Sequence, residues 1–218
     1  MIQYLINKHF FNLLILTLTF GILLYDAIGF DYTDEICALF LFILFSIYLF
    51  STSDWNFNKG FLTTIGIFLF YFCYSLYIGS NTKTAIISDM LIQIKPYLAF
   101  FCVYSMMPRF SDSKKNIMKS ICLIFWLLLL SIGLGTIVKP RILFNLMGHP
   151  TYYAAAVICV SFCYLYCSKF TNLEKITFIA LLSIGLISSR SKFYGFFALT
   201  AFITFYFSNI KQFKDMAI

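Results

Sequence analysis

Long apolar stretches alternate with short polar connections along the whole chain. A membrane-spanning helix needs roughly 20 predominantly apolar residues, and windows of about this length fit the chain eight times when flanking residues extend the shorter ones. The predicted spans are Phe10–Phe30, Ile36–Phe50, Phe61–Gly79, Thr84–Met107, Asn116–Val138, Tyr152–Ser168, Lys175–Ser189 and Phe193–Ile210. The pattern therefore predicts an all-α fold, a polytopic transmembrane helical bundle of about eight spans, with residues 1–218 forming a single integral membrane domain.

Composition supports the same class. Hydrophobic residues make up 61% of the chain and charged residues 11%, which leaves too few polar side chains to cover the surface of a soluble domain. Lys8 precedes the first apolar run, a pattern shared by signal peptides and first transmembrane helices. The further spans favour a retained helix.

Lysine and arginine set the predicted orientation, because cytoplasmic connections carry the excess of positive charge. With the N-terminus inside, most of the 16 basic residues fall on the cytoplasmic side, and the opposite side holds Lys83, Lys139, Arg141, Arg190 and Lys192. Both termini are therefore predicted to be cytoplasmic. The net charge of +7 reflects this topology, and no RNA-binding signature or soluble basic domain indicates a nucleic-acid partner.

The seven cysteines are expected to behave as small apolar side chains. Cys159, Cys163 and Cys167 recur every four residues and share one helix face. A metal site would need further ligands, and no histidine or acidic residue shares that helix. We therefore expect no metal and no cofactor.

Lys95 lies near the middle of the fourth apolar stretch, beside Pro96 and a short distance after Asp89. A lysine at the membrane centre costs about 3 kcal/mol on insertion scales, so such a residue usually faces a bundle interior or a water-filled cavity. Pro96 removes a backbone donor and leaves carbonyls that could accept from the ammonium group. The alternative is a helix that begins later, with Lys95 reaching the outer interface.

Two outer connections collect polar and basic residues. The first runs from Lys139 and Arg141 to a Gly-Pro turn that presents His149, and the second is the tight turn Ser188-Ser189-Arg190-Ser191-Lys192. Arginine binds phosphate oxygens in a bidentate manner, lysine supplies a point charge, and hydroxyls and helix-start amides add donors. The sequence predicts an outward-facing anion site, and simple contact with lipid headgroups is the alternative.

The segment Gly148-His149-Pro150-Thr151-Tyr152-Tyr153-Ala154, followed by Ser188-Ser189-Arg190-Ser191-Lys192 at the start of an apolar helix, resembles bacterial O-antigen polymerases and ligases. The resemblance extends over the whole chain as a layout of hydropathy and charge. It implies an inner-membrane glycosyltransferase that uses a polyprenyl-pyrophosphate-linked oligosaccharide at the periplasmic face, in the lipid bilayer, alongside other polysaccharide-assembly membrane proteins.

This chemistry assigns roles to the outer residues. Negative charge develops on the pyrophosphate leaving group, and fixed guanidinium groups stabilise such charge. Arg190 is the first expected pyrophosphate ligand, assisted by Lys192 and Arg141, with Lys95 as a deeper contact. His149 is the expected catalytic base for the acceptor hydroxyl, because histidine commonly serves as a general base.

Family members are typically longer, and their large periplasmic loop, with a histidine and further arginines, follows the region where this chain ends. The chain thus resembles the N-terminal part of such a protein: a truncated product, a piece completed by another polypeptide, or a short relative. Two other classes fit the same residues, a transporter or flippase for an anionic lipid-linked substrate and a noncatalytic membrane scaffold. A transporter would show matching interrupted spans in its two halves.

Overall fold

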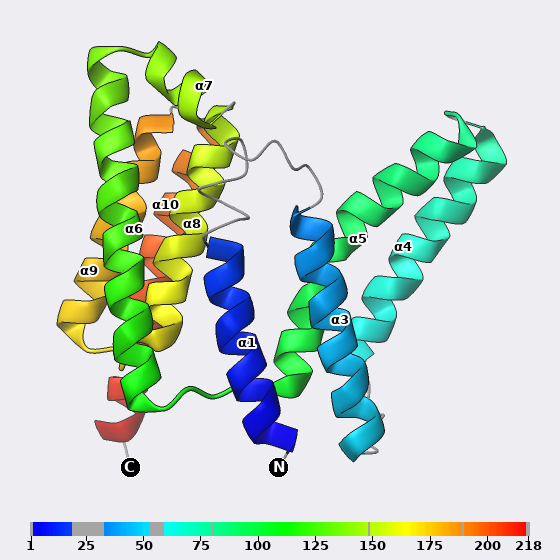
Figure 1. Cartoon of the computed structure of the whole chain (residues 1–218), viewed down its shortest axis with the longest axis horizontal. Helices are drawn as coiled ribbons and strands as arrows, with labels where there is room; N and C mark the ends of the chain where they lie inside the picture. The colour runs from blue at the N-terminus through cyan, green and yellow to red at the C-terminus, as the bar shows by residue number, and fades with distance from the viewer. Residues whose placement is uncertain are drawn as a thin grey trace. The chain divides into compact units, whose positions relative to one another are not determined.

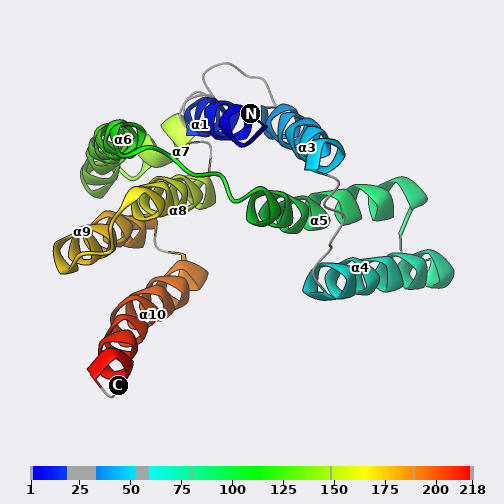
Figure 2. The ribbon, with the colours of Figure 1, turned by 90° about the horizontal axis from the view of Figure 1, so that it is seen from below.

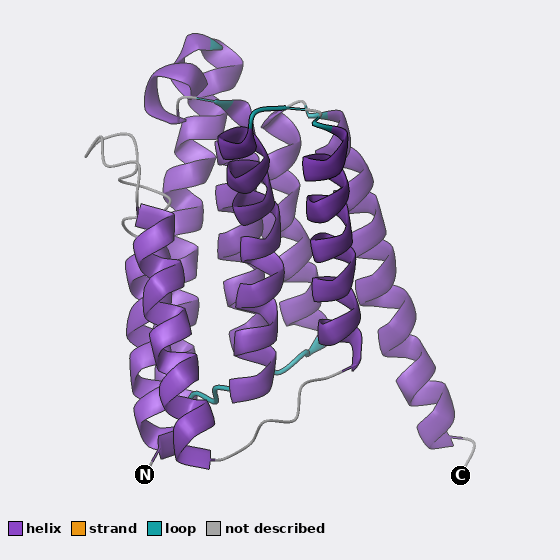
Figure 3. Cartoon of the chain, turned by 90° about the vertical axis from the view of Figure 1, so that its right-hand side faces the viewer, coloured by secondary structure: helices purple, strands orange, loops and turns teal. Residues whose placement is uncertain are grey.

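The computed structural model describes residues 2–18, 33–52, 59–79, 81–147, 149–188 and 190–216, and the regular secondary structure in this part of the chain is helical, joined by loops (Figure 3). The elements are α1 (Ile2–Leu18), α3 (Thr33–Thr52), α4 (Lys59–Ile78), α5 (Lys83–Met106), α6 (Asp112–Val138), α7 (Arg141–Met147), α8 (Pro150–Cys167), α9 (Asn172–Ser183), the 3₁₀ helix η2 (Ile184–Ser188) and α10 (Ser191–Met216). The helices form two compact units, with α1 to α5 in the first and α6 to α10 in the second (Figure 1). A single integral membrane domain stays a prediction.

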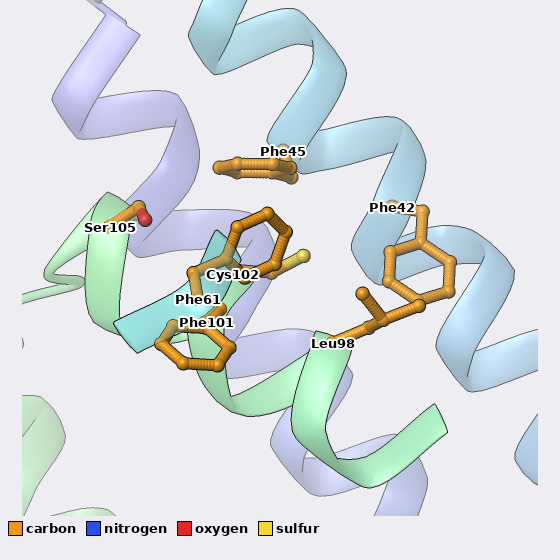
Figure 4. A pocket seen from close by; sticks show the side chains of 7 residues that line it. All are labelled: Phe42, Phe45, Phe61, Leu98, Phe101, Cys102 and Ser105. Carbon is orange, nitrogen blue, oxygen red and sulfur yellow. The ribbon is translucent and has the colours of Figure 1, made fainter. Parts of the chain in front are cut away.

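In the first unit, α5 packs against both α3 and α4, and Figure 2 shows it between them. Aromatic rings form much of the contact between α4 and α5: Phe61 meets Phe101 edge to face, with ring centroids 4.8 Å apart. A mostly apolar hollow of about 230 Å³ lies among the three helices (Figure 4), lined by Phe42, Phe45, Phe61, Leu98, Phe101, Cys102 and Ser105. The Cys102 thiol and the Ser105 hydroxyl are the polar groups in this aromatic and aliphatic lining.

The N-terminal helix is tied to the end of α5 by polar contacts. The amide of Gln3 donates to the Met106 carbonyl at 3.3 Å, and the backbone N–H of Arg109 donates to Asn7 Oδ1 at 2.7 Å. Met107 adopts the left-handed conformation that ends α5, and the following Pro108 cannot continue the helix.

In the second unit, α6 and α8 make the most extensive contact. Tyr153 is fully buried between them and its hydroxyl donates to the Leu129 carbonyl at 3.0 Å. Small residues allow this close approach, because a Cβ at Gly133 would lie 2.5 Å from the Tyr153 hydroxyl. Trp126 of α6 also donates its indole N–H to the Leu181 carbonyl of α9, at 3.1 Å.

Burial differs strongly among the apolar helices. Half of the apolar window of α8 is buried in the structure, whereas no residue of α4 is buried. α8 is therefore a core helix of its unit, and α4 is a peripheral one that meets α5 along a single side.

Within the described residues, four helices are long and apolar enough to cross a membrane: Lys59–Ile78, Lys83–Met106, Asp112–Val138 and Pro150–Cys167. A shorter apolar segment, Ile36–Thr52, lies on α3. These helices indicate a multi-pass membrane protein.

The prediction of eight spans is wrong. The predicted span Lys175–Ser189 is not one helix, because α9 ends at Ser183 and the chain tightens into the 3₁₀ helix η2. The first predicted span starts inside α1 and runs past Leu18, out of the described residues. Part of the last, Phe193–Ile210, falls on residues whose side chains are not described.

Candidate functional site

The two outer connections predicted from the sequence meet at one end of the second unit. α6 and η2 end here, while α8 and α10 begin here, because consecutive helices run in opposite directions (Figure 1). This end carries Lys139, Arg141, Arg190 and Lys192, which we call the basic rim. Two sequence segments about 40 residues apart are thereby brought into one site.

His149 caps the start of α8. Its backbone is extended (φ −148°, ψ 140°), and Pro150 follows at the first helical position, where the missing N–H costs nothing. The side-chain Nδ1 atom accepts from the backbone N–H of Thr151 at 3.2 Å. The local sequence thus fixes the histidine ring at the helix entrance.

Arg190 lies against His149. Its Nη2 atom is 2.9 Å from His149 Nε2, and the two residues come from the separate turns that precede α10 and α8. The Arg190 carbonyl accepts from the backbone N–H of Phe193 at 2.9 Å, so the residue stands directly before α10. Its Nε atom is buried and has no hydrogen-bond partner among the described residues.

A cavity of about 570 Å³ opens beside this pair, between α8 and α10. Its lining divides by chemistry, with a polar part where α8 and α10 begin and an apolar part farther along both helices. The residues are Thr151, Arg190, Ser191 and Lys192 in the polar part, and Ala154, Ala155 and Ile158 of α8 with Phe193 and Phe196 of α10 in the apolar part. A cavity of this shape suits a ligand with an anionic head and an apolar tail.

Phe193 anchors the polar part. Its side chain is only 4% exposed and packs directly on Gly185 of η2, where an added Cβ would lie 2.1 Å from the ring. Tyr194 adds a hydrogen bond from its hydroxyl to the Leu186 carbonyl at 3.3 Å. These contacts join the first turn of α10 to η2 and so position Arg190 and Lys192.

The electrostatic field at this end is positive. The acidic side chains that the structure describes in the second unit are Asp112 and Glu174, and both belong to the opposite end. The 27-residue α6 separates the ends by about 40 Å, several times the Debye length of about 8 Å at physiological salt. The N-termini of α8 and α10 add partial positive charge, so the site favours an anion.

The opposite end is held by a polar network. Lys119 of α6 forms an ion pair with Glu174 of α9, with Nζ and Oε1 2.5 Å apart and side chains 20% and 14% exposed. Glu174 also completes a capping box with Thr171. The hydrogen bond from Lys119 and those from backbone groups lower the pKa of Glu174 to about 2. This network stabilises the fold and lies far from the cavity.

The predicted site residues are distributed unevenly. Arg190 and Lys192 line the cavity and His149 contacts Arg190. Arg141 begins α7 and is exposed at the same end, outside the cavity lining. Lys95 belongs to the first unit, where it is half-buried; because α5 begins at Lys83, the helix does not start after Lys95.

The apolar half of the cavity was not predicted. Ala154 and Ala155 follow His149 by little more than one turn, and a run of alanines in an otherwise large-residue chain is the signal that could have indicated it. Phe193 and Phe196 carried no such signal among 28 phenylalanines.

A second polar hollow lies in the first unit, between α4 and α5. It has a volume of about 270 Å³, and Ser75, Asn81, Asp89 and Gln93 line it together with aromatic and aliphatic side chains. Asp89 lies about 9 Å along α5 from its start at Lys83, within a helix long enough to cross a membrane.

Comparison of the chain with protein-family models, with curated proteins and with solved structures finds no match in any of the three.

Proposed function

We propose that this protein is a membrane glycan polymerase or ligase relative that binds a polyprenyl-pyrophosphate-linked oligosaccharide in the cavity between α8 and α10. The observation that carries the proposal is the divided lining of that cavity, with Thr151, Arg190, Ser191 and Lys192 where α8 and α10 begin and alanine, isoleucine and phenylalanine along the rest. The pyrophosphate binds at the cations, and the isoprenoid chain lies along the apolar part.

The chemistry follows from the charge of the leaving group. Transfer of the sugar breaks the bond between its anomeric carbon and a phosphate oxygen, and the electron pair of that bond stays on the pyrophosphate. The Arg190 guanidinium, which stands just before the turn of α10 that Phe193 packs against η2, stabilises this developing charge. Lys192 adds a second positive charge from the same turn.

The structure supports the roles predicted for Arg141, Lys95 and His149 to different degrees. Arg141 lies at the same end of the second unit and is proposed to attract the anionic substrate to the basic rim. Lys95 as a deeper contact stays a prediction. The role of His149 as catalytic base also stays a prediction, and it requires an unprotonated Nε2 atom.

The basic rim is proposed to face the periplasm of a bacterial inner membrane, with both termini cytoplasmic. The opposite end carries Lys114, Lys115, Lys119, Lys169 and Lys175, in keeping with the excess of positive charge on the cytoplasmic side. Other polysaccharide-assembly membrane proteins are the proposed partners.

The test is binding of a fluorescent polyprenyl pyrophosphate to purified protein in nanodiscs of neutral lipid. Arg190→Ala is expected to weaken binding at least tenfold, because a charge-assisted hydrogen bond contributes about 1.5–3 kcal/mol. Arg190→Lys restores part of the loss if bidentate contact matters. Lys139→Ala is the matched control, since it removes a rim cation that does not line the cavity. Equal binding by Arg190→Ala and Lys139→Ala would refute the proposal.

A transporter or flippase is the second candidate, and α5 favours it. This helix carries Asp89 in a polar hollow, Lys95 in its middle and Pro96 inside the helix, features typical of substrate paths in membranes. In proteoliposomes, a transporter would move the fluorescent lipid between leaflets and lose that activity on Asp89→Asn. A noncatalytic scaffold would show neither binding nor movement of the lipid.

A further inference from the structure

The imidazole of His149 faces hydrogen-bond donors on both of its nitrogen atoms. The backbone N–H of Thr151 approaches Nδ1 at 3.2 Å, and Arg190 Nη2 approaches Nε2 at 2.9 Å. A neutral imidazole has one lone pair and one N–H, and an imidazolium has no lone pair at all, while arginine has no acceptor. In one of the two contacts, therefore, two donors face each other.

The two donors differ in their freedom to move. The Thr151 N–H is one of the first amides of α8, where no intrahelical acceptor exists and the helix fixes its direction. The Arg190 guanidinium stands on a flexible side chain, has five N–H groups, and has an Nε atom without a hydrogen-bond partner among the described residues. The fixed amide therefore determines the tautomer: Nδ1 keeps the lone pair and Nε2 carries the hydrogen.

The consequence is a pair of donors, His149 Nε2–H and Arg190, side by side at the positive ends of α8 and α10. A phosphate group presents several oxygens, so neighbouring donors can bind it together once the guanidinium has turned toward it. An anion that accepts from both groups thereby removes the opposition between the two donors.

We propose that His149 is an anion ligand that caps α8 with Nδ1 and donates from Nε2 to the same phosphate group as Arg190, in place of acting as the catalytic base. This inference rests on the proposed function, because it names a further residue of the same pyrophosphate site. A base would need its lone pair on Nε2, since Nδ1 is engaged with the Thr151 N–H.

Two variants of His149 with side chains of equal size distinguish an anion ligand from a catalytic base. Asparagine and aspartate are both strong N-cap residues, so His149→Asn and His149→Asp should each retain the start of α8. Asparagine offers an amide donor to a phosphate, whereas aspartate offers only negative charge. An anion ligand therefore tolerates asparagine better, and a base tolerates aspartate better because a carboxylate can accept a proton.

The probes are inorganic pyrophosphate and a fluorescent polyprenyl pyrophosphate, with purified protein in nanodiscs of neutral lipid. We expect binding about tenfold weaker in His149→Asn, and at least tenfold weaker again in His149→Asp, with unchanged thermal unfolding in both.

Binding of the lipid-linked probe alone would identify the apolar tail as necessary, and binding of both would show that the phosphates suffice. If His149→Asp binds as well as or better than His149→Asn, the inference is overturned while the proposed function stands. If the unmodified protein binds neither probe, both fail.

Nitrogen NMR gives a second, independent measurement. The chain has two histidines, so His9→Gln leaves His149 as the single source of imidazole signals in ¹⁵N-histidine-labelled protein. With pyrophosphate bound, we expect a protonated Nε2 and an unprotonated Nδ1. The opposite tautomer would overturn the inference even if both variants bound weakly.

Discussion

Replacing Gly185 with alanine should disturb the site from a position that touches no ligand. An added Cβ would lie 2.1 Å from Cζ of Phe193 and 2.7 Å from each Cε atom. Carbon atoms at rest lie about 3.5–4.0 Å apart, so the ring or the backbone of η2 must move by about 1.5 Å. The ring is 4% exposed and has little free space, and overpacking of this kind costs about 1–3 kcal/mol.

The displacement reaches the site through the chain itself. Phe193 directly follows Lys192, and its backbone N–H donates to the carbonyl of Arg190 just before α10, so a shift of the ring moves both cations. A misplacement of about 1 Å can lower the rate of a positioned reaction by about a hundredfold. We expect Gly185→Ala to lower both the midpoint of thermal unfolding and the affinity for polyprenyl pyrophosphate.

Two further variants make the test specific. Gly195→Ala adds the same methyl group to α10 where nothing lies within 4 Å, so it should leave stability unchanged or raise it slightly. Phe193→Leu removes the ring atoms that Gly185→Ala would meet, and the double variant should recover part of the lost stability. If Gly185→Ala unfolds at the temperature of the unmodified protein, or if Phe193→Leu rescues nothing, the contact does not position α10.

Two predictions concern the rest of the second unit. The pKa of Glu174 is about 2 in the fold against an ordinary 4.5, so the ion pair with Lys119 contributes stability above pH 4.5 that is lost as the pH falls toward 2. Unfolding followed by circular dichroism from pH 7 to pH 3 should show a decline in this window that Glu174→Gln lacks; parallel curves would contradict the assignment. Tyr153→Phe removes the hydroxyl bonded to the Leu129 carbonyl and should cost about 1 kcal/mol, whereas Tyr152→Phe, at a 54% exposed position, should cost close to nothing. Equal losses in the two variants would show that the buried hydroxyl is not the cause.

The helical class follows from the sequence, while the number of spans does not. Hydropathy depends on composition within a window and is insensitive to where a helix changes its geometry. The segment from Lys175 to Ser189 is apolar enough to suggest a span, yet α9 ends at Ser183 and η2 continues as a 3₁₀ helix. The close packing of Gly185 on Phe193 belongs to this region, and it depends on how η2 and α10 pack together, which an average over a window does not record.

The polar half of the site was accessible from the sequence, because two cations in a tight turn are unusual on the side that the charge pattern predicts to be the outer one. Ser188 to Lys192 and the turn at His149 were expected on one face, and Arg190 does contact His149. The orientation of the imidazole was not accessible, since it depends on the cap at Thr151. The apolar half depends on how α8 and α10 pack, which short degenerate motifs do not encode.

The unequal burial of α4 and α8 bears on how such a chain can diverge. Half of the α8 window is enclosed by other helices, so each change there must fit several neighbours at once, whereas α4 has no enclosed residue. Natural selection then acts on α4 mainly through its length and overall hydrophobicity, and on α8 through the identity of individual residues. Descendants of one ancestor would keep α8 recognisable long after α4 had lost all trace of common origin.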